Sequence, residues 1–279
     1  MARSDLRAWV AAALVAVTSP ASADTPQRVV SLNVCTDQTL LLLGNPAQIA
    51  SLSSLSVDPR SSVYADKAQA FPRNDGSAES VVLDQPDLVL AGRYTTRATV
   101  EMLERLGIRV EVFDPADSLA MARSNIARMG DLLGPDAKAR AQTLLADFDS
   151  RLAALRATPG PHPRVALYYA LGNTAGTNTL GGDLLAAAGL ENIAADLGMP
   201  FGGALPLEAL ILADPDLILT GQPYASPARA TDLLMHPVLQ RSGKLRGLNE
   251  GANWLCGTPA LLDAVADLVQ IRLDWSIAR

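Results

Sequence analysis

The chain has 279 residues, of which 49% are hydrophobic and 19% are charged, and its formal net charge is −6. A chain this apolar can bury a full core, which excludes a disordered tail, and its length allows one large domain or two of ordinary size. It contains no block of basic residues, so we expect no nucleic-acid partner.

Residues 1–23 have the three parts of a secretory signal peptide. Arg3 and Arg7 supply the positive segment, Ala8–Val17 is a short apolar segment, and Ala21–Ala23 is a small-residue cleavage site. The apolar segment is too short to cross a membrane, which takes roughly 20 residues. No cysteine stands at the cleavage site for a lipid anchor. We therefore expect a soluble protein that is exported to the periplasm.

Alternating strands and helices are predicted over residues 24–117. The strands cover Arg28–Leu32, Ile49–Ser53, Asp87–Ala91 and Arg109–Phe113, and the helices cover Cys35–Leu43 and Thr95–Leu106. Such alternation is typical of parallel strands joined by helical crossovers, so this segment is predicted to form an N-terminal α/β lobe.

Residues 118–158 carry helix signals and no strand signal. Gly134 and Pro135 divide the segment, and its second part, Asp136–Ala157, is long enough for roughly 33 Å of helix. Three prolines and a glycine between Thr158 and Pro163 mark its end. We expect stiff helices that bridge two lobes.

A C-terminal α/β lobe is predicted over residues 159–279. Its strands cover Arg164–Ala170, Asp216–Thr220 and Gly251–Leu255, and its helices cover Gly182–Ala188, Pro206–Leu212 and Pro259–Ile277. The whole chain is therefore expected to be an α/β protein with two lobes.

One sequence module occurs once in each lobe. The first copy runs from Glu79 to Gly92, and the second runs from Glu208 to Gly221, 129 residues later. In both copies a glutamate stands seven residues before Pro-Asp-Leu and thirteen before the glycine. The module predicts a short helix, a turn, a strand buried on both faces and a glycine exit.

The two glutamates have two interpretations. A carboxylate in the first turn of a helix is stabilised by the helix dipole, which explains each glutamate without any partner. Their matched placement, once in each lobe, favours instead a role in an interaction. We prefer the second interpretation for Glu79 and Glu208.

The chain resembles the periplasmic binding proteins that serve ABC importers of vitamin B12, ferric siderophores and haem. The resemblance covers about residues 27–277 and rests on Arg28–Leu32, Leu106–Asp114 and Gly181–Ala194, together with the two glutamate modules. It implies two Rossmann-like lobes bridged by a long α-helix, with the ligand in the cleft between them at the carboxyl ends of the strands.

The resemblance also implies how the protein works. It is similar to monomers that need no cofactor of their own, bind a small metal chelate and deliver it to a dimeric inner-membrane permease. In this family one glutamate from each lobe docks onto arginines of the permease, and the matching residues here are Glu79 and Glu208.

The loops after the predicted strands supply the candidate ligand-binding residues. They are Asn33, Cys35, Thr36, Arg93, Tyr94, Asn173, Gln222, Tyr224, Trp254 and Cys256. Trp254 and Tyr94 stand out, because aromatic residues make up only 4% of the chain and stack well on large planar ligands. Arg93 suits a ligand carboxylate or phosphate, or else a surface salt bridge.

The two cysteines, Cys35 and Cys256, leave three alternatives open. In an oxidising compartment they can form a disulfide, which would join the two lobes across the cleft. They can also be two free thiols that face the cleft, or they can simply be buried. The geometry of the fold decides between these alternatives.

The ligand is expected to be a metal chelate. Haem-binding members of the family often place a tyrosine shortly before the first docking glutamate, and this chain has none in Phe71–Ala78. That difference favours a cobalamin-like corrinoid or a ferric siderophore over haem, which stays an alternative.

Other functions fit the sequence less well. Zinc import needs several histidines, and the chain has two, which are not at metal-ligand spacing. We find no nucleophile-elbow, P-loop, dinucleotide-binding or zinc-protease motif, and Asp58 and Asp183 suit turns and helix starts better than acid–base chemistry, so we expect no enzyme. A sensor that reports its ligand to a signalling receptor remains an alternative.

Overall fold

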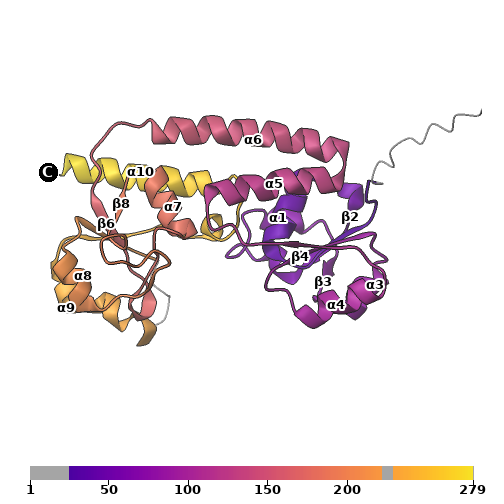
Figure 1. Cartoon of the computed structure of the whole chain (residues 1–279), viewed down its shortest axis with the longest axis horizontal. Coiled ribbons are helices and arrows are strands. Elements are labelled where there is room, and N and C mark those ends of the chain that lie inside the picture. Colours follow the sequence, from indigo (N-terminus) through magenta and orange to yellow (C-terminus); the bar gives the residue numbers. More distant parts are fainter. Residues whose placement is uncertain (1–24, 222–228, 279) are drawn as a thin grey trace, which may run out of the picture.

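The computed structural model describes residues 25–221 and 229–278 (Figure 1). Two α/β lobes lie next to each other, and helix α6 (Pro135–Arg156) runs along one side of both. This confirms the predicted α/β fold of two lobes bridged by a long helix. The signal peptide predicted over residues 1–23 lies outside the described residues.

The N-terminal lobe is built on a parallel sheet. Its strand order is β3 (Arg73–Asn74), β2 (Ile49–Ser53), β1 (Val29–Ser31), β4 (Leu88–Gly92) and β5 (Val110–Phe113). Its helices are α1 (Val34–Leu43), α2 (Ala65–Ala68), α3 (Ala78–Leu83) and α4 (Arg97–Arg105). Every residue of β4 is buried, which fits a strand covered on both faces.

The C-terminal lobe repeats the centre of this arrangement. Its parallel sheet has the order β11 (Leu245–Gly247), β10 (Leu217–Thr220), β6 (Arg164–Leu167) and β8 (Glu191–Asn192), beside a small antiparallel pair, β7 (Asn173–Thr174) and β9 (Gly203–Ala204). Its helices are α7 (Leu180–Ala187), α8 (Leu207–Ala213), α9 (Pro237–Arg241) and α10 (Leu261–Ile277). Leu88 pairs with Val29 in the first lobe, and Leu217 pairs with Val165 at the corresponding place in the second.

The strand predicted over Gly251–Leu255 is wrong. A single 3-10 turn, Ala252–Trp254, occupies this position, and the Asn253 side chain accepts a hydrogen bond from the Gly251 backbone N–H at 3.2 Å. The last strand is β11, which lies earlier in the chain at an exposed edge of the sheet. Its Leu-Arg-Gly sequence lacks the apolar run of a buried strand, so the sequence pattern did not reveal it.

The Pro-Asp turns of the repeated module fix the neighbouring strand in each lobe. The carboxylate of Asp87 accepts hydrogen bonds from the backbone N–H groups of Gln27 and Arg28, at 2.6 and 3.0 Å. The carboxylate of Asp216 accepts one from the backbone N–H of Arg164 at 2.9 Å. Each aspartate therefore holds the start of the strand that pairs with its own.

Two helices belong to both lobes. The start of α5 (Leu119–Leu133) and the end of α6 pack in the core of the C-terminal lobe. The end of α5 and the start of α6 pack in the core of the N-terminal lobe. Arg123 of α5 and Asp149 of α6 form a salt bridge, with both nitrogen–oxygen distances 2.6 Å. Moving one lobe against the other therefore disturbs packed helices. In the described part of the chain, no helix combines the length and apolar character of a membrane span.

Candidate functional site

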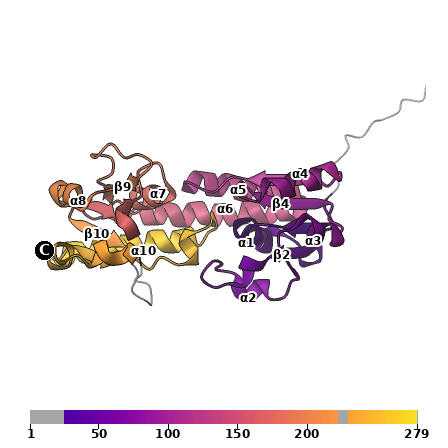
Figure 2. The same cartoon turned by 90° about the horizontal axis from the view of Figure 1, so that it is seen from below.

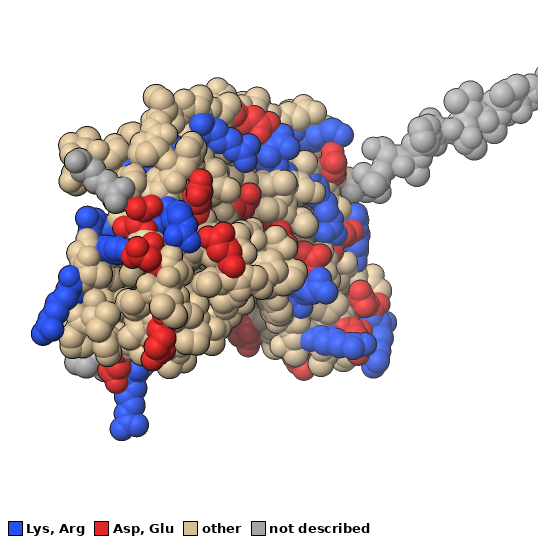
Figure 3. Space-filling view, turned by 60° about the vertical axis from the view of Figure 1, so that its left-hand side comes forward, with Lys and Arg blue, Asp and Glu red and all other residues tan. Residues whose placement is uncertain are grey.

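A cavity of about 480 Å³ lies where the two lobes meet. Its lining comes from both lobes and consists of Arg60, Tyr169, Ala175, Thr179, Leu180, Gly181, Glu250, Gly251, Trp254 and Leu255. The surface is also hollowed between the lobes on the side away from α6 (Figure 3). Tyr169 and Glu250 lie beyond the carboxyl ends of β6 and β11, which is where open parallel sheets bind ligands.

A hydrogen-bonded pair, Tyr169 and Glu250, forms the polar part of this cavity. The Tyr169 hydroxyl donates to Oε1 of Glu250 at 2.7 Å. Burial raises the pKa of the Glu250 carboxyl, and burial together with the nearby Glu250 charge raises the pKa of the Tyr169 hydroxyl. A carboxylate has about four acceptor positions on its two oxygens, so Glu250 can accept a further hydrogen bond from a ligand.

Gly221, the exit glycine of the second module, makes room for Glu250. A Cβ atom at Gly221 would lie 2.7 Å from Oε2 of Glu250. Gly92, the exit glycine of the first module, makes room in the same way, since a Cβ atom there would lie 2.7 Å from Nδ2 of Asn33. The paired glycines thus let a polar side chain approach the end of the central strand in each lobe.

The walls of the cavity differ in character. Trp254 is half-buried, and it packs against the C-terminal core while it lines the cavity. Arg60 is the cavity residue from the N-terminal lobe, and its exposed guanidinium is paired with Asp58 at 3.1 Å. Among the described lining residues, Arg60 is the one cation. The site therefore combines the aromatic side chain of Trp254 with the Glu250 carboxylate as a hydrogen-bond acceptor.

The ligand-binding residues predicted in the N-terminal lobe do not line this cavity. Asn33 is half-buried and caps α1, where its side-chain oxygen accepts from the Cys35 backbone N–H at 2.9 Å. Thr36 is buried, and its hydroxyl bonds to the Asn33 carbonyl at 2.9 Å, so it does not face the cleft. Arg93 is paired with Asp114 at 2.7 Å, the surface salt bridge that the sequence left open.

The remaining predicted residues have mixed outcomes. Tyr94 is exposed and does not line the cavity. Asn173 is exposed on β7 and donates to the Ala170 carbonyl at 3.0 Å. Gln222 and Tyr224 lie outside the described residues. Of the predicted set, the structure brings Trp254 into the cavity.

Sequence reasoning missed nine of the ten residues that line the cavity, among them the polar residues Arg60, Tyr169 and Glu250. Tyr169 fell inside the strand predicted over Arg164–Ala170, although β6 ends at Leu167. Glu250 was hidden because the last strand was placed after it instead of before it. Arg60 follows Asp58-Pro59 in a loop and carried no signal beyond its charge. A second aromatic residue next to Tyr168 in an aromatic-poor chain was the one available signal for Tyr169.

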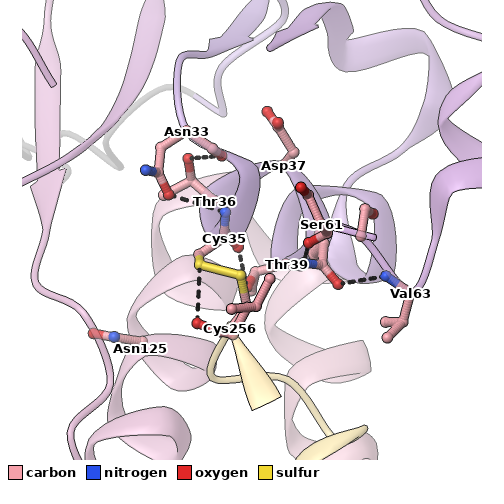
Figure 4. Close-up of a disulfide and its surroundings, with 12 residues drawn as sticks. Asn33, Cys35, Thr36, Asp37, Thr39, Ser61, Val63, Asn125 and Cys256 are labelled. Carbon is pink, nitrogen blue, oxygen red and sulfur yellow. Dashed lines mark hydrogen bonds between the residues drawn. A yellow bond between two sulfur atoms is a disulfide. The ribbon is translucent and has the colours of Figure 1, made fainter. Parts of the chain in front are cut away.

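A disulfide joins Cys35 of α1 to Cys256 in the segment before α10, which decides between the three alternatives for the cysteines (Figure 4). Their Cα atoms are 5.1 Å apart, although 221 positions separate them in the sequence. Cys256 is buried, so its side chain is not a ligand-facing group. The neighbouring Leu255 lines the cavity, and the disulfide therefore connects the two lobes next to the candidate site.

A further contact between the lobes lies near this disulfide. Tyr64 of the N-terminal lobe lies near Thr258 and Asp263 of the C-terminal lobe, and burial is the main cause that raises its pKa. At the start of α5, which packs in the C-terminal core, the backbone N–H of Leu119 donates to the Asp183 carboxylate of α7 at 2.7 Å, so this bond anchors a bridging helix to the C-terminal lobe. Its sequence context suggested a role for Asp183 at the start of its own helix, but the cap there is Thr179, and Asp183 instead binds the start of α5. The lobes are held together by more than the bridging helices.

The two glutamates of the module occupy equivalent positions. Glu79 lies in the first turn of α3 and Glu208 in the first turn of α8, and both side chains are exposed. The two helices lie toward opposite ends of the molecule, one in each lobe, on the side away from α6 (Figures 1 and 2). The helices that carry the two exposed glutamates therefore lie on the same side of the protein, one in each lobe.

A two-lobed fold with a cavity between the lobes is typical of proteins that bind small molecules. The family model described as "Periplasmic binding protein" matches residues 29–243. The chain therefore belongs to the periplasmic binding protein family.

Known proteins are similar to this chain in sequence or in structure. A cobalamin-binding protein of Halobacterium salinarum is 33% identical over 201 residues, which covers 70% of this chain and 54% of the relative. The chain thus spans about half the length of the curated relatives it matches. A periplasmic haem-binding protein of Pseudomonas aeruginosa superposes with a TM-score of 0.67 at 25% identity, covering 88% of this chain and 92% of the other.

Two further solved structures support the fold alone. The periplasmic haem-binding protein of Roseiflexus sp. RS-1, in its apo form, has a TM-score of 0.70 at 23% identity and covers 90% of this chain and 99% of its own. The periplasmic vitamin B12-binding protein of Vibrio cholerae has a TM-score of 0.61 at 17% identity, and the match covers 90% of this chain and 98% of the Vibrio protein.

Proposed function

We propose that this protein captures a metal chelate, preferably a cobalamin-like corrinoid, in the cleft between its lobes and delivers it to an ABC import permease. The observation that carries the proposal is the cavity in which Trp254 lies near the hydrogen-bonded pair of Tyr169 and Glu250. Family membership and the cobalamin-binding relative support it. A ferric siderophore is the next ligand to consider.

The chemistry of the cavity favours a corrinoid over haem. Haem carries two propionates, which need cationic partners, whereas the rim of a corrinoid carries amide groups with N–H donors. Glu250 repels carboxylates and accepts from amides, and Arg60 is already paired with Asp58. The indole of Trp254 offers a face for a flat macrocycle, with about 0.5–1.5 kcal/mol beyond burial alone.

The size of the cavity limits how much of such a ligand can enter it. Small-molecule sites have volumes of roughly 300–1,000 Å³, and this cavity falls in that range. A complete corrinoid is larger than about 480 Å³. We therefore expect its amide-bearing edge to enter the cavity and the rest to occupy the hollow between the lobes.

Delivery is proposed to use the two glutamates of the repeated module. Glu79 and Glu208 are exposed, one in each lobe, as docking to two equivalent arginine-bearing surfaces requires. In this proposal the protein acts as a periplasmic monomer and the permease as a dimer.

Native mass spectrometry of the protein from its own periplasm tests the proposed ligand. A co-purified corrinoid supports the proposal, and a ferric siderophore retains the transport function with a different ligand. Haem as the bound species contradicts the argument from the Glu250 carboxylate. If the adjacent genes encode a signalling receptor and no permease, the sensor alternative replaces the transport function.

A further inference from the structure

Each copy of the repeated module presents an exposed apolar pair beside its glutamate. In α3 the pair is Val82–Leu83, with 39% and 84% of the residue surface exposed. In α8 the pair is Ile211–Leu212, with 40% and 85% exposed. The two lobes therefore expose the same kinds of side chain at equivalent positions and to the same degree.

Folding does not account for these apolar residues. The core-facing residues of the module are Ala78 and Val81 in α3 and Leu210 in α8, and of these Val81 and Leu210 are fully buried. A helix this short buries one face only, and Leu83 and Leu212 lie on the other. Single exposed leucines are common on proteins, but a matched pair in two lobes requires a further explanation.

The apolar pairs share a helix face with the glutamates. Val82 and Leu83 follow Glu79 by three and four residues, and Ile211 and Leu212 follow Glu208 by the same intervals. Residues at these spacings are neighbours on a helix surface. Each lobe thus carries one acidic-apolar patch, defined as Glu79, Val82 and Leu83 in the first and as Glu208, Ile211 and Leu212 in the second.

We propose that the acidic-apolar patches are docking surfaces in which the apolar pair is buried against the membrane permease. This inference rests on the proposed transport function and adds the apolar residues to it. The partner it fits is a dimer of one chain, in which each copy offers an apolar surface next to a basic residue.

The symmetry and charge of the patches select this occupant. Two equivalent patches on one chain match two copies of a partner related by a two-fold axis. The glutamate in each patch needs a basic counterpart, and it disfavours an anionic lipid surface. A second copy of this chain docked patch to patch would bring Glu79 or Glu208 against another glutamate, which costs binding energy.

The test measures binding of the mature protein to its purified permease–ATPase complex in lipid nanodiscs. The informative variants are Leu83→Ser, Leu212→Ser and the double variant. Ile277→Ser is the matched control, because Ile277 is equally exposed at 82% but lies on α10, which packs against α6. We expect each single variant to bind about tenfold more weakly and the double variant about a hundredfold, because burial of one leucine is worth at least a tenfold change.

The outcomes separate this inference from the proposed function. If the double leucine variant binds like the wild type while Glu79→Lys with Glu208→Lys abolishes binding, the apolar pairs have no docking role and the transport function stands. If the wild type does not bind the permease, both proposals fail. If Leu83 instead supports self-association of the protein, a second copy is the occupant and the inference is wrong.

Two further measurements keep the result interpretable. The apolar contribution should persist at high salt, where a purely electrostatic docking weakens. The thermal unfolding midpoints of the leucine variants should match that of Ile277→Ser. Leu83→Gln and Leu212→Gln, which favour helix, repeat the measurement if the serine variants are less stable.

Discussion

Cys35 and Cys256 are bonded to each other across the boundary between the two lobes, next to the cavity that we propose as the ligand site. The bond connects the first turn of α1 to the segment that precedes α10. The bridging helices α5 and α6 hold the lobes together along one side of the molecule. The disulfide adds a covalent connection between them.

Removing the disulfide should destabilise the protein and loosen the cleft. Closing a loop of this length contributes on the order of 5 kcal/mol by chain entropy, so Cys35→Ser with Cys256→Ser should unfold at a clearly lower temperature. Amide hydrogen exchange should rise in residues 252–258 and in the first turn of α1, because these segments lose their connection. Unchanged exchange there would mean that the surrounding contacts alone fix the lobes. Reduction of the wild type is the matching control.

Ligand affinity should depend on the ionisation of Glu250. Burial raises the pKa of this carboxyl, so it gains a proton at a higher pH than an exposed glutamate and then loses acceptor capacity. The affinity for cyanocobalamin should therefore fall as the pH falls through this raised pKa. Glu250→Gln should bind roughly 10–100-fold more weakly at neutral pH, with little pH dependence left, as judged by isothermal titration calorimetry.

Tyr169→Phe separates the two members of the pair. This variant keeps the carboxylate and removes its hydrogen-bond donor, so the pH dependence of ligand binding should remain while the affinity decreases.

A pH profile of the Glu250→Gln variant that matches the wild type would contradict the assigned role of the carboxylate.

Asp37 should make the stability of the protein depend on pH. Burial raises the pKa of this carboxyl to about 6, and hydrogen bonds from Ser53 only partly offset the rise. The folded state therefore binds the proton more tightly than the unfolded state. The resulting stabilisation is complete below the ordinary pKa near 3.8 and is lost as the pH rises through about 6.

Comparison with Asp37→Asn isolates this effect. Between pH 4 and pH 7 the wild type should lose on the order of 2–3 kcal/mol of unfolding free energy relative to the variant. Urea denaturation at several pH values measures the difference. Parallel curves for the two proteins would show that Asp37 has an ordinary pKa.

Reversing the charge of the two glutamates that we propose for docking should stop delivery without affecting capture. Glu79→Lys with Glu208→Lys places two positive charges where the permease is proposed to present arginines, so uptake should be abolished. Because both residues are exposed and lie outside the cavity lining, ligand affinity should stay at the wild-type value. Normal uptake by the double variant would contradict the docking role.

Much of the fold could be predicted because the hydrophobic pattern of each strand and helix can be recognised within a short stretch of sequence. The apolar run of β4 and its copy in β10 required strands covered on both faces, and the long helical pattern after Gly134 became α6. The last strand could not be found in this way, because β11 is a short, exposed edge strand whose position depends on pairing with β10.

The site was harder to predict than the fold. Trp254 was identified from the rarity of aromatic residues and its place at the end of the last predicted strand. Glu250 was not, because it enters the cavity only where Gly221 leaves space for it. The cysteine pairing needed three-dimensional distances that the sequence does not contain. Likewise, the apolar run that includes Leu83 gives no indication that this leucine is exposed.

Fluorescence titration of the mature protein with cyanocobalamin tests the central claim most directly. Of the three tryptophans, Trp9 lies in the predicted signal peptide, Trp254 lines the cavity and Trp275 packs against the C-terminal core. The account predicts saturable one-to-one quenching that is largely lost in Trp254→Phe and retained in Trp275→Phe. Absence of quenching and of any thermal shift with cyanocobalamin, a ferric siderophore or haem would contradict it.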